Sequence, residues 1–111
     1  MESIRQQKVG RLLQKEVGEI LNRGEVKPLD KSMISITGVR LTPDLSIARI
    51  YISIFPSEDK AADLEKVKER SAEIRYVLGK KAAKQLRHIP ELIFFLDDSF
   101  DYAEKIDDLL K

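Results

Sequence analysis

Basic side chains gather without an intervening acid between residues 75 and 88 of this 111-residue chain. They are Arg75, Lys80, Lys81, Lys84 and Arg87, with His88 beside them. In one helix continued to Pro90, the last five would lie within an arc of about 120°, away from the apolar Ile74, Leu78 and Leu86. A solvated helix face usually interleaves acids, as the preceding stretch does, whereas an uninterrupted cationic face suits RNA phosphates. We therefore expect an RNA-phosphate surface here, with simple solvation as the alternative.

A second set of cations lies on the first predicted helix, residues 3–22. Placed at 100° per residue, these cations fall within about 120° on the side opposite the apolar residues. They are Arg5, Lys8, Arg11 and Lys15. A second RNA-binding patch and a solvated face explain them equally well, because Glu16 and Glu19 lie on the same helix. His88 could stack on a base, although a lone histidine near a helix end more often interacts with the helix carbonyls.

The remaining composition excludes most enzyme classes. The chain has no cysteine and one histidine, and it contains neither a glycine-rich phosphate loop nor a nucleophile elbow. We therefore expect no catalytic activity, no metal site and no cofactor. With no apolar run near the roughly 20 residues that span a bilayer, and no secretory signal, the chain is expected to be cytoplasmic.

The net charge of +1 is a cancellation between two parts of the chain. Residues 1–90 carry 18 Lys and Arg against 12 Asp and Glu, whereas residues 91–111 carry 2 against 7. A basic body is thus followed by an acidic tail, which is predicted to form a short helix capped by Ser99. Asp97, Asp98 and Asp101 suit a helix N-terminus better than a metal site.

Periodicity predicts the elements that position the cations. The helix over residues 3–22 ends at Gly24. A strand with a bulge at Gly38 follows, and a turn at residues 42–46 connects it to a second strand. The second strand is expected to bury alternate residues from Ala48 to Ile54. A long helical region capped by Ser57 runs to Pro90 with a break near Ser71 or Gly79. A buried strand begins at Glu91.

This order, α-β-β-α-(break)-α-β, predicts an α+β fold. Helices are expected to cover one face of a three-stranded sheet in a single KH-like domain of type II, a recurrent RNA-binding arrangement, over residues 1–111. The acidic helix of residues 99–111 would follow the last strand.

Three segments in this order resemble the bacterial ribosome-binding factor A family along nearly the whole chain. They are "RQQKVGRLLQKEVGEIL", "ITGVRLTPDLSIARIYISIF" and "IRYVLGKKAAKQLRHIPELIFFLDDS". The resemblance implies a KH-like fold in which a kinked helix pair replaces the GxxG loop. It also implies a non-enzymatic factor that binds the immature 30S subunit and its 16S rRNA and supports late maturation and rRNA processing, including at low temperature. Neighbouring ribosomal proteins and assembly GTPases would be further partners, and we expect a monomer.

The sequence departs from this family at two places. Where the family carries Ala-x-Gly at the kink, this chain has Arg70, Ser71 and Ala72, which predicts a shallower kink or one held by Ser71 bonding to a preceding carbonyl. The loop after the first helix reads "KPLDK" where the family has Asp-Pro-Arg. An alternative function is a protein-docking adaptor acting through the acidic C-terminal helix or an open sheet edge.

Overall fold

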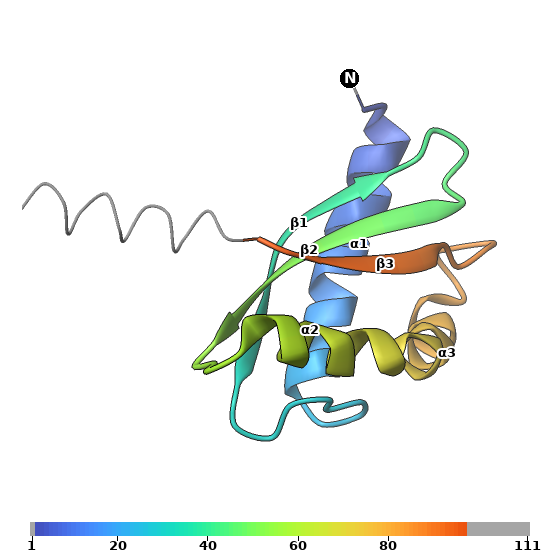
Figure 1. Ribbon diagram of the computed structural model, residues 1–111. Helices are drawn as coiled ribbons and strands as arrows, with labels where there is room; N and C mark the ends of the chain where they lie inside the picture. Colours follow the sequence, from blue (N-terminus) through green and yellow to red (C-terminus); the bar gives the residue numbers. More distant parts are fainter. Residues whose placement is uncertain (1, 98–111) are drawn as a thin grey trace, which may run out of the picture.

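The computed structural model describes residues 2–97 and contains three helices and a three-stranded sheet (Figure 1). Along the chain these elements are α1 (Ile4–Asn22), β1 (Met33–Leu41), β2 (Ile47–Phe55), α2 (Lys60–Glu69), α3 (Ser71–Ala82) and β3 (Glu91–Leu96). The sheet order is β1-β2-β3, with β1 and β2 antiparallel and β2 and β3 parallel. The predicted α+β, KH-like order is confirmed. The predicted tail helix of residues 99–111 lies outside the described residues.

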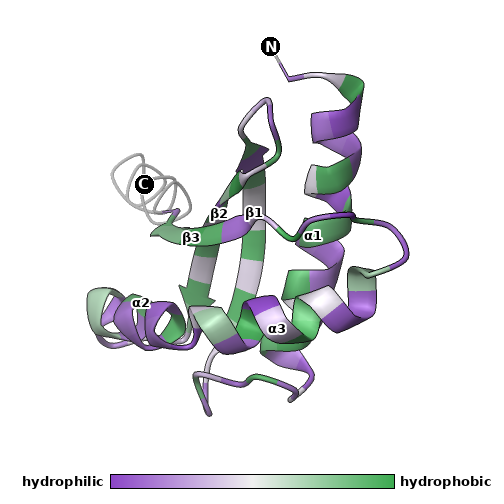
Figure 2. Cartoon of the chain, turned by 90° about the vertical axis from the view of Figure 1, so that its right-hand side faces the viewer, coloured by the Kyte–Doolittle hydropathy of each residue, from purple (hydrophilic) through white to green (hydrophobic). Residues whose placement is uncertain are grey.

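One hydrophobic core joins the helices to one face of the sheet. Alternate strand residues are buried, from Ala48 to Ile54 in β2 and at Leu92 and Phe94 in β3, because successive side chains of a strand point to opposite faces. These residues share a cluster with buried side chains of α1, α2 and α3, so the helices cover the same face. Apolar and polar residues alternate along the ribbons accordingly (Figure 2). The opposite face carries a stacked pair, Tyr51 and Phe95, with ring centroids 5.4 Å apart.

Helix α1 is fastened to β1 along its length. The Ser3 hydroxyl and the Gln6 amide form a capping box at its N-terminus, and the Gln6 side chain also donates to the Leu41 carbonyl, 2.8 Å away. At the other end the Asn22 amide donates to the Ile34 carbonyl (2.6 Å) and accepts from the Ile34 N–H (2.9 Å). These bonds fix the position of α1, which carries four exposed cations, relative to the sheet.

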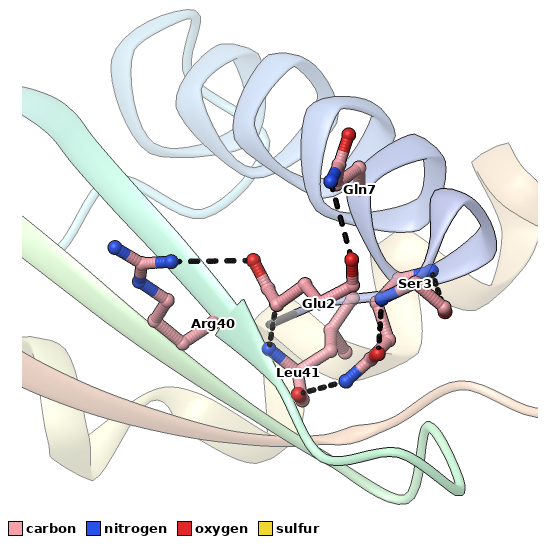
Figure 3. Close-up of polar contacts among 6 residues, drawn as sticks. Glu2, Ser3, Gln7, Arg40 and Leu41 are labelled. Atoms are coloured by element: carbon pink, nitrogen blue, oxygen red, sulfur yellow. Dashed lines mark hydrogen bonds and ion pairs between the residues drawn. The ribbon is translucent and has the colours of Figure 1, made fainter.

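Glu2, which precedes α1, forms hydrogen bonds with the end of β1. The Glu2 carboxylate accepts hydrogen bonds from the Leu41 N–H (3.2 Å) and the Arg40 guanidinium (3.3 Å), while the Gln7 side chain donates to the Glu2 carbonyl (Figure 3). Because Leu41 ends an edge strand, its N–H would otherwise face water. Arg40 is thus partly neutralised, although its side chain is largely exposed.

The sheet confirms the predicted bulge and turn. The β1–β2 register shifts between Ile36 and Gly38, which leaves Thr37 as the extra residue. In the turn, the Asp44 carboxylate accepts hydrogen bonds from the Thr42 hydroxyl and from the N–H and hydroxyl of Ser46. These bonds lower the pKa of Asp44, the Ser46 hydroxyl contributing most.

The helix break falls at Arg70, one residue before Ser71, as predicted, and Gly79 lies within α3. Two details of the prediction were wrong. The cap of α2 is Asp59, whose side chain accepts from the Ala62 N–H, because the helix begins at Lys60; Ser57 instead donates to Asp63. The Ser71 hydroxyl lies 3.4 Å from the Leu92 carbonyl of β3 and bonds to no preceding carbonyl. The break between α2 and α3 is therefore in contact with the neighbouring strand, β3.

The predicted continuation of the helix to Pro90 was also wrong. Helix α3 ends at Ala82, and residues 83–90 form a non-helical connection to β3, which we call the connector. Leu86 and Ile89 of the connector pack against the core and Pro90 is buried, so burial of these side chains competes with continuation of the helix. The helical arc predicted for Lys84, Arg87 and His88 therefore does not exist.

Within residues 2–97, no helix is long and apolar enough to cross a membrane, and no group of three or more His, Cys, Asp and Glu could hold a metal ion. Of the three aspartates considered for such a site, only Asp97 is described, and it accepts a hydrogen bond from the Thr37 hydroxyl.

Candidate nucleic-acid interface

The connector is held against α3 by Arg75. The Arg75 guanidinium donates to the Ile89 carbonyl (2.8 Å) and to the Pro90 carbonyl (3.2 Å). Gly79 lies against the connector, and a methyl group there would be at ordinary contact distance, 3.6 Å, from Cγ1 of Ile89. Arg75 was predicted to contact RNA, and the structure gives it a positioning contact on the protein itself.

Helix α3 and the connector enclose a shallow groove of about 730 Å³, which we call the connector groove. Four of the predicted RNA-binding residues line it, namely Arg75, Lys80, Arg87 and His88. Arg87 and His88 also line a recess of about 470 Å³ that Arg5 of α1 shares. The fold therefore gathers these cations by bringing two helices and an irregular segment together, and not along one helix face.

Lys81 lies apart from the connector groove. Its ammonium lies 2.6 Å from the carboxylate of Glu25, in the loop after α1. This hydrogen bond raises the pKa of Lys81, and the charges of Glu25, Glu16 and Glu19 act in the same direction. By contrast, Lys84 is exposed and forms no ion pair with another residue of the range 2–97.

The cations of α1 have different surroundings. All four are exposed, but only Arg5 lines the recess shared with the connector. Arg11 lies with Glu2 and Arg40 around a separate hollow of about 330 Å³ on the β1 side. Lys8 and Lys15 line none of these hollows.

The residues at the helix break, Arg70, Ser71 and Ala72, lie in a third region, close to the edge strand β3. Arg70 donates to the Lys27 carbonyl and pairs with Glu73 at 2.7 Å, which lowers the pKa of Glu73. Ser71 shares a hollow of about 350 Å³ with Lys68 and with Leu92–Phe94 of β3. Ala72 is exposed at the start of α3 and lines one end of the connector groove.

One prominent residue of this surface was missed in the sequence. Tyr76 is 66% exposed and lines the connector groove, with the Lys80 ammonium 4.7 Å from the centre of its ring. The spacing of four residues between them places both on one helix face, so the pair could have been noticed. The Lys81–Glu25 pair had no such local signal, because 56 positions separate its members in the sequence.

Comparison with known proteins identifies the family. The sequence profile described as "Ribosome-binding factor A" matches residues 5–110. The chain belongs to the ribosome-binding factor A family. A ribosome-binding factor A from Cytophaga hutchinsonii is 49% identical over 110 residues, which cover 99% of this chain and 83% of that protein.

Solved structures of ribosome-binding factor A share the fold. The crystal structure of the Thermus thermophilus protein matches with a TM-score of 0.67 at 20% identity, covering 82% of this chain and 94% of that one. A homology model of that protein, fitted into the cryo-EM map of a 30S–ribosome-binding factor A complex, matches with a TM-score of 0.63 at 20% identity, covering 80% and 91%. At this identity the likeness extends to the fold alone.

Proposed function

We propose that this protein is a non-enzymatic assembly factor that binds the immature 30S subunit in the cytoplasm as a monomer. It would contact 16S rRNA and neighbouring ribosomal proteins, and support late maturation and rRNA processing, including at low temperature. An assembly GTPase would be a further partner. The observation that carries the proposal is the convergence of Lys80, Arg87 and His88 on one groove in a member of this family.

The binding surface would consist of the connector groove, the exposed Lys84 and the recess shared with Arg5. Cations on such a surface neutralise phosphates and release condensed counterions, each contact contributing about 0.7–0.9 to the slope of log K against log salt concentration. Phosphate contacts of this kind position the protein without reading sequence. Recognition of one assembly intermediate then depends on the shape of the RNA and on adjacent proteins.

A charge-reversal experiment tests this function. Replacing Lys80, Lys84 and Arg87 together by glutamate should abolish association with immature small subunits, while circular dichroism and urea unfolding stay unchanged. The matched control is Lys27, Lys31 and Arg49 replaced by glutamate, because these two lysines and one arginine are exposed and carry the same charge elsewhere on the molecule. Association that survives the first triple substitution, or is lost equally in the control, contradicts the proposed surface.

Protein docking is a second candidate, favoured by one feature of the open sheet face. Met33 and Phe55 are direct cross-strand neighbours, and they are 65% and 75% exposed. An exposed apolar pair at the end of a sheet suits contact with a neighbouring ribosomal protein. Replacing both by serine would then weaken association with the subunit without changing its salt dependence. Unchanged association would remove this candidate.

A further inference from the structure

The connector groove has a composition that phosphate binding alone does not require. Four of its lining residues are small or apolar, namely Ala72, Gly79, Ala83 and Ile89. Arg75, Lys80 and Arg87 also line it, and no carboxylate from residues 2–97 does. A lining that combines apolar and cationic groups fits a ligand that has both an apolar plane and a negative charge.

The groove is also held open by contacts within the protein. The two hydrogen bonds from Arg75 fix the connector backbone at Ile89 and Pro90. Ile89 packs against the core from the other side, and Ile74 and Leu78 anchor the adjoining face of α3 in the interior. A ligand would therefore find the two walls already in place, which lowers the ordering cost of binding.

Tyr76 supplies an aromatic plane in the groove lining. Tyr76 is 66% exposed, and the Lys80 ammonium lies over one face of its ring, so a base would stack on the opposite face with positive charge close by. Nucleobases stack on aromatic side chains whatever their sequence, because every base has a π-face. The phosphate of a nucleotide whose base stacks on Tyr76 would lie close to the flexible Lys80 and Arg87 side chains, which line the same groove.

We propose that the connector groove binds one unpaired RNA nucleotide, with its base stacked on Tyr76 and its phosphate held by Lys80 and Arg87. This inference rests on the proposed function and adds that the RNA bound there is single-stranded. In a duplex the bases are stacked on one another and present no free face to the ring. The protein would thereby favour an rRNA segment that is not yet paired.

A fluorescence experiment tests the inference directly. The chain has no tryptophan, so Tyr76→Trp places a single reporter in the groove. Titration with an unpaired oligoribonucleotide should quench its emission, whereas a duplex with the same number of phosphates should not at equal saturation. Equal quenching by both RNAs, or by an acidic peptide of the same charge, would overturn the proposal, as would no quenching by any of them.

Binding measurements on the unlabelled protein complete the test. Tyr76→Ala should lower affinity for the unpaired RNA about fivefold to a hundredfold, leave the salt slope unchanged, and leave duplex affinity unaffected. Tyr76→Phe should retain the affinity, and Ile4→Ala, which truncates an apolar side chain of similar exposure outside the groove, is the control. If charge reversal abolishes subunit binding but Tyr76→Ala has no effect on either RNA, the nucleotide site is wrong while the proposed function stands. If charge reversal has no effect, the proposed RNA surface and the nucleotide site on it are both wrong.

Discussion

The ammonium of Lys81 lies 2.6 Å from the carboxylate of Glu25. The basic block of the sequence, residues 75–88, therefore contains one cation that already forms an ion pair within the protein. Glu16 and Glu19 add to the negative potential there. We expect Lys81→Ala to weaken RNA binding less than Lys84→Ala, which should reduce the salt slope by about 0.7–0.9. Titrations at several salt concentrations measure both effects.

The reciprocal test removes the carboxylate that pairs with Lys81. Glu25→Gln removes the carboxylate while keeping a side chain of similar size, so it should strengthen RNA binding and make it more dependent on salt. Because the substitution changes the net charge of the whole protein, the control is Glu58→Gln at an exposed position remote in sequence from the basic block. A larger loss in Lys81→Ala than in Lys84→Ala would contradict this assignment.

Arg75 is expected to act mainly through the connector. Arg75→Lys keeps the charge but cannot donate to the Ile89 and Pro90 carbonyls from two sites of one rigid group. Loss of these partly exposed bonds should destabilise the protein by about 1 kcal/mol and speed amide hydrogen exchange across residues 84–89. Unfolding in urea and hydrogen exchange measure the two effects. Unchanged exchange together with weakened RNA binding would instead make Arg75 a direct phosphate ligand.

The sequence predicted the sheet well because its signals are local. Gly38 shifts the alternation of apolar residues by one, and the structure has the bulge there; Ala48 through Ile54 alternate, and all four inward residues are buried. The break at Arg70 was also anticipated to within one residue. In each case the pattern of a few neighbouring residues carries the information.

The end of α3 was missed because tertiary contacts decide it. Residues 83–89 contain no proline or glycine and could continue a helix. However, Leu86 and Ile89 pack against the core, and the Arg75 guanidinium donates a hydrogen bond to the Ile89 carbonyl. Helix propensity is a weak preference that such contacts override. The cations were predicted to share one helix face, whereas their grouping in the fold depends on which elements meet in three dimensions.

The helix break should not depend on a glycine at position 72. Ala72 is exposed in the first turn of α3, and the preceding Arg70 is already held by the Lys27 carbonyl and by Glu73. Ala72→Gly should therefore cost about 0.5–1 kcal/mol of stability through backbone entropy without increasing affinity for the subunit. Thermal unfolding and a binding assay measure this. Tighter binding by the glycine variant would indicate that the break limits function.

Asn22 is predicted to be among the polar residues on which stability depends most. Its half-buried amide satisfies both the N–H and the carbonyl of Ile34 and so joins α1 to β1. Asn22→Ala leaves these groups without that partner and should cost about 1–3 kcal/mol in urea unfolding. Gln7→Ala, which removes an exposed bond to the Glu2 carbonyl, should change stability by less than about 0.5 kcal/mol. Similar losses in both variants would contradict the assignment.

Asp44 makes the stability of the β1–β2 turn depend on pH. Hydrogen bonds from Ser46 and Thr42 to its carboxylate lower its pKa in the folded protein, so the unfolded chain binds a proton more readily. Its contribution to stability is therefore present above the ordinary carboxyl range and is lost as the pH falls through the lowered pKa. Asp44→Asn should be less stable than the parent protein at neutral pH, and the difference should shrink below about pH 4.

Urea unfolding of both proteins across this range measures the effect. Ser46→Ala removes the strongest donor to Asp44, so it should reproduce part of the loss with the same dependence on pH. The double variant should then show little additional loss, because the two substitutions remove the same interaction. A difference between parent and Asp44→Asn that stays constant down to acid pH would mean that the turn is held by backbone geometry and not by the ionised carboxylate.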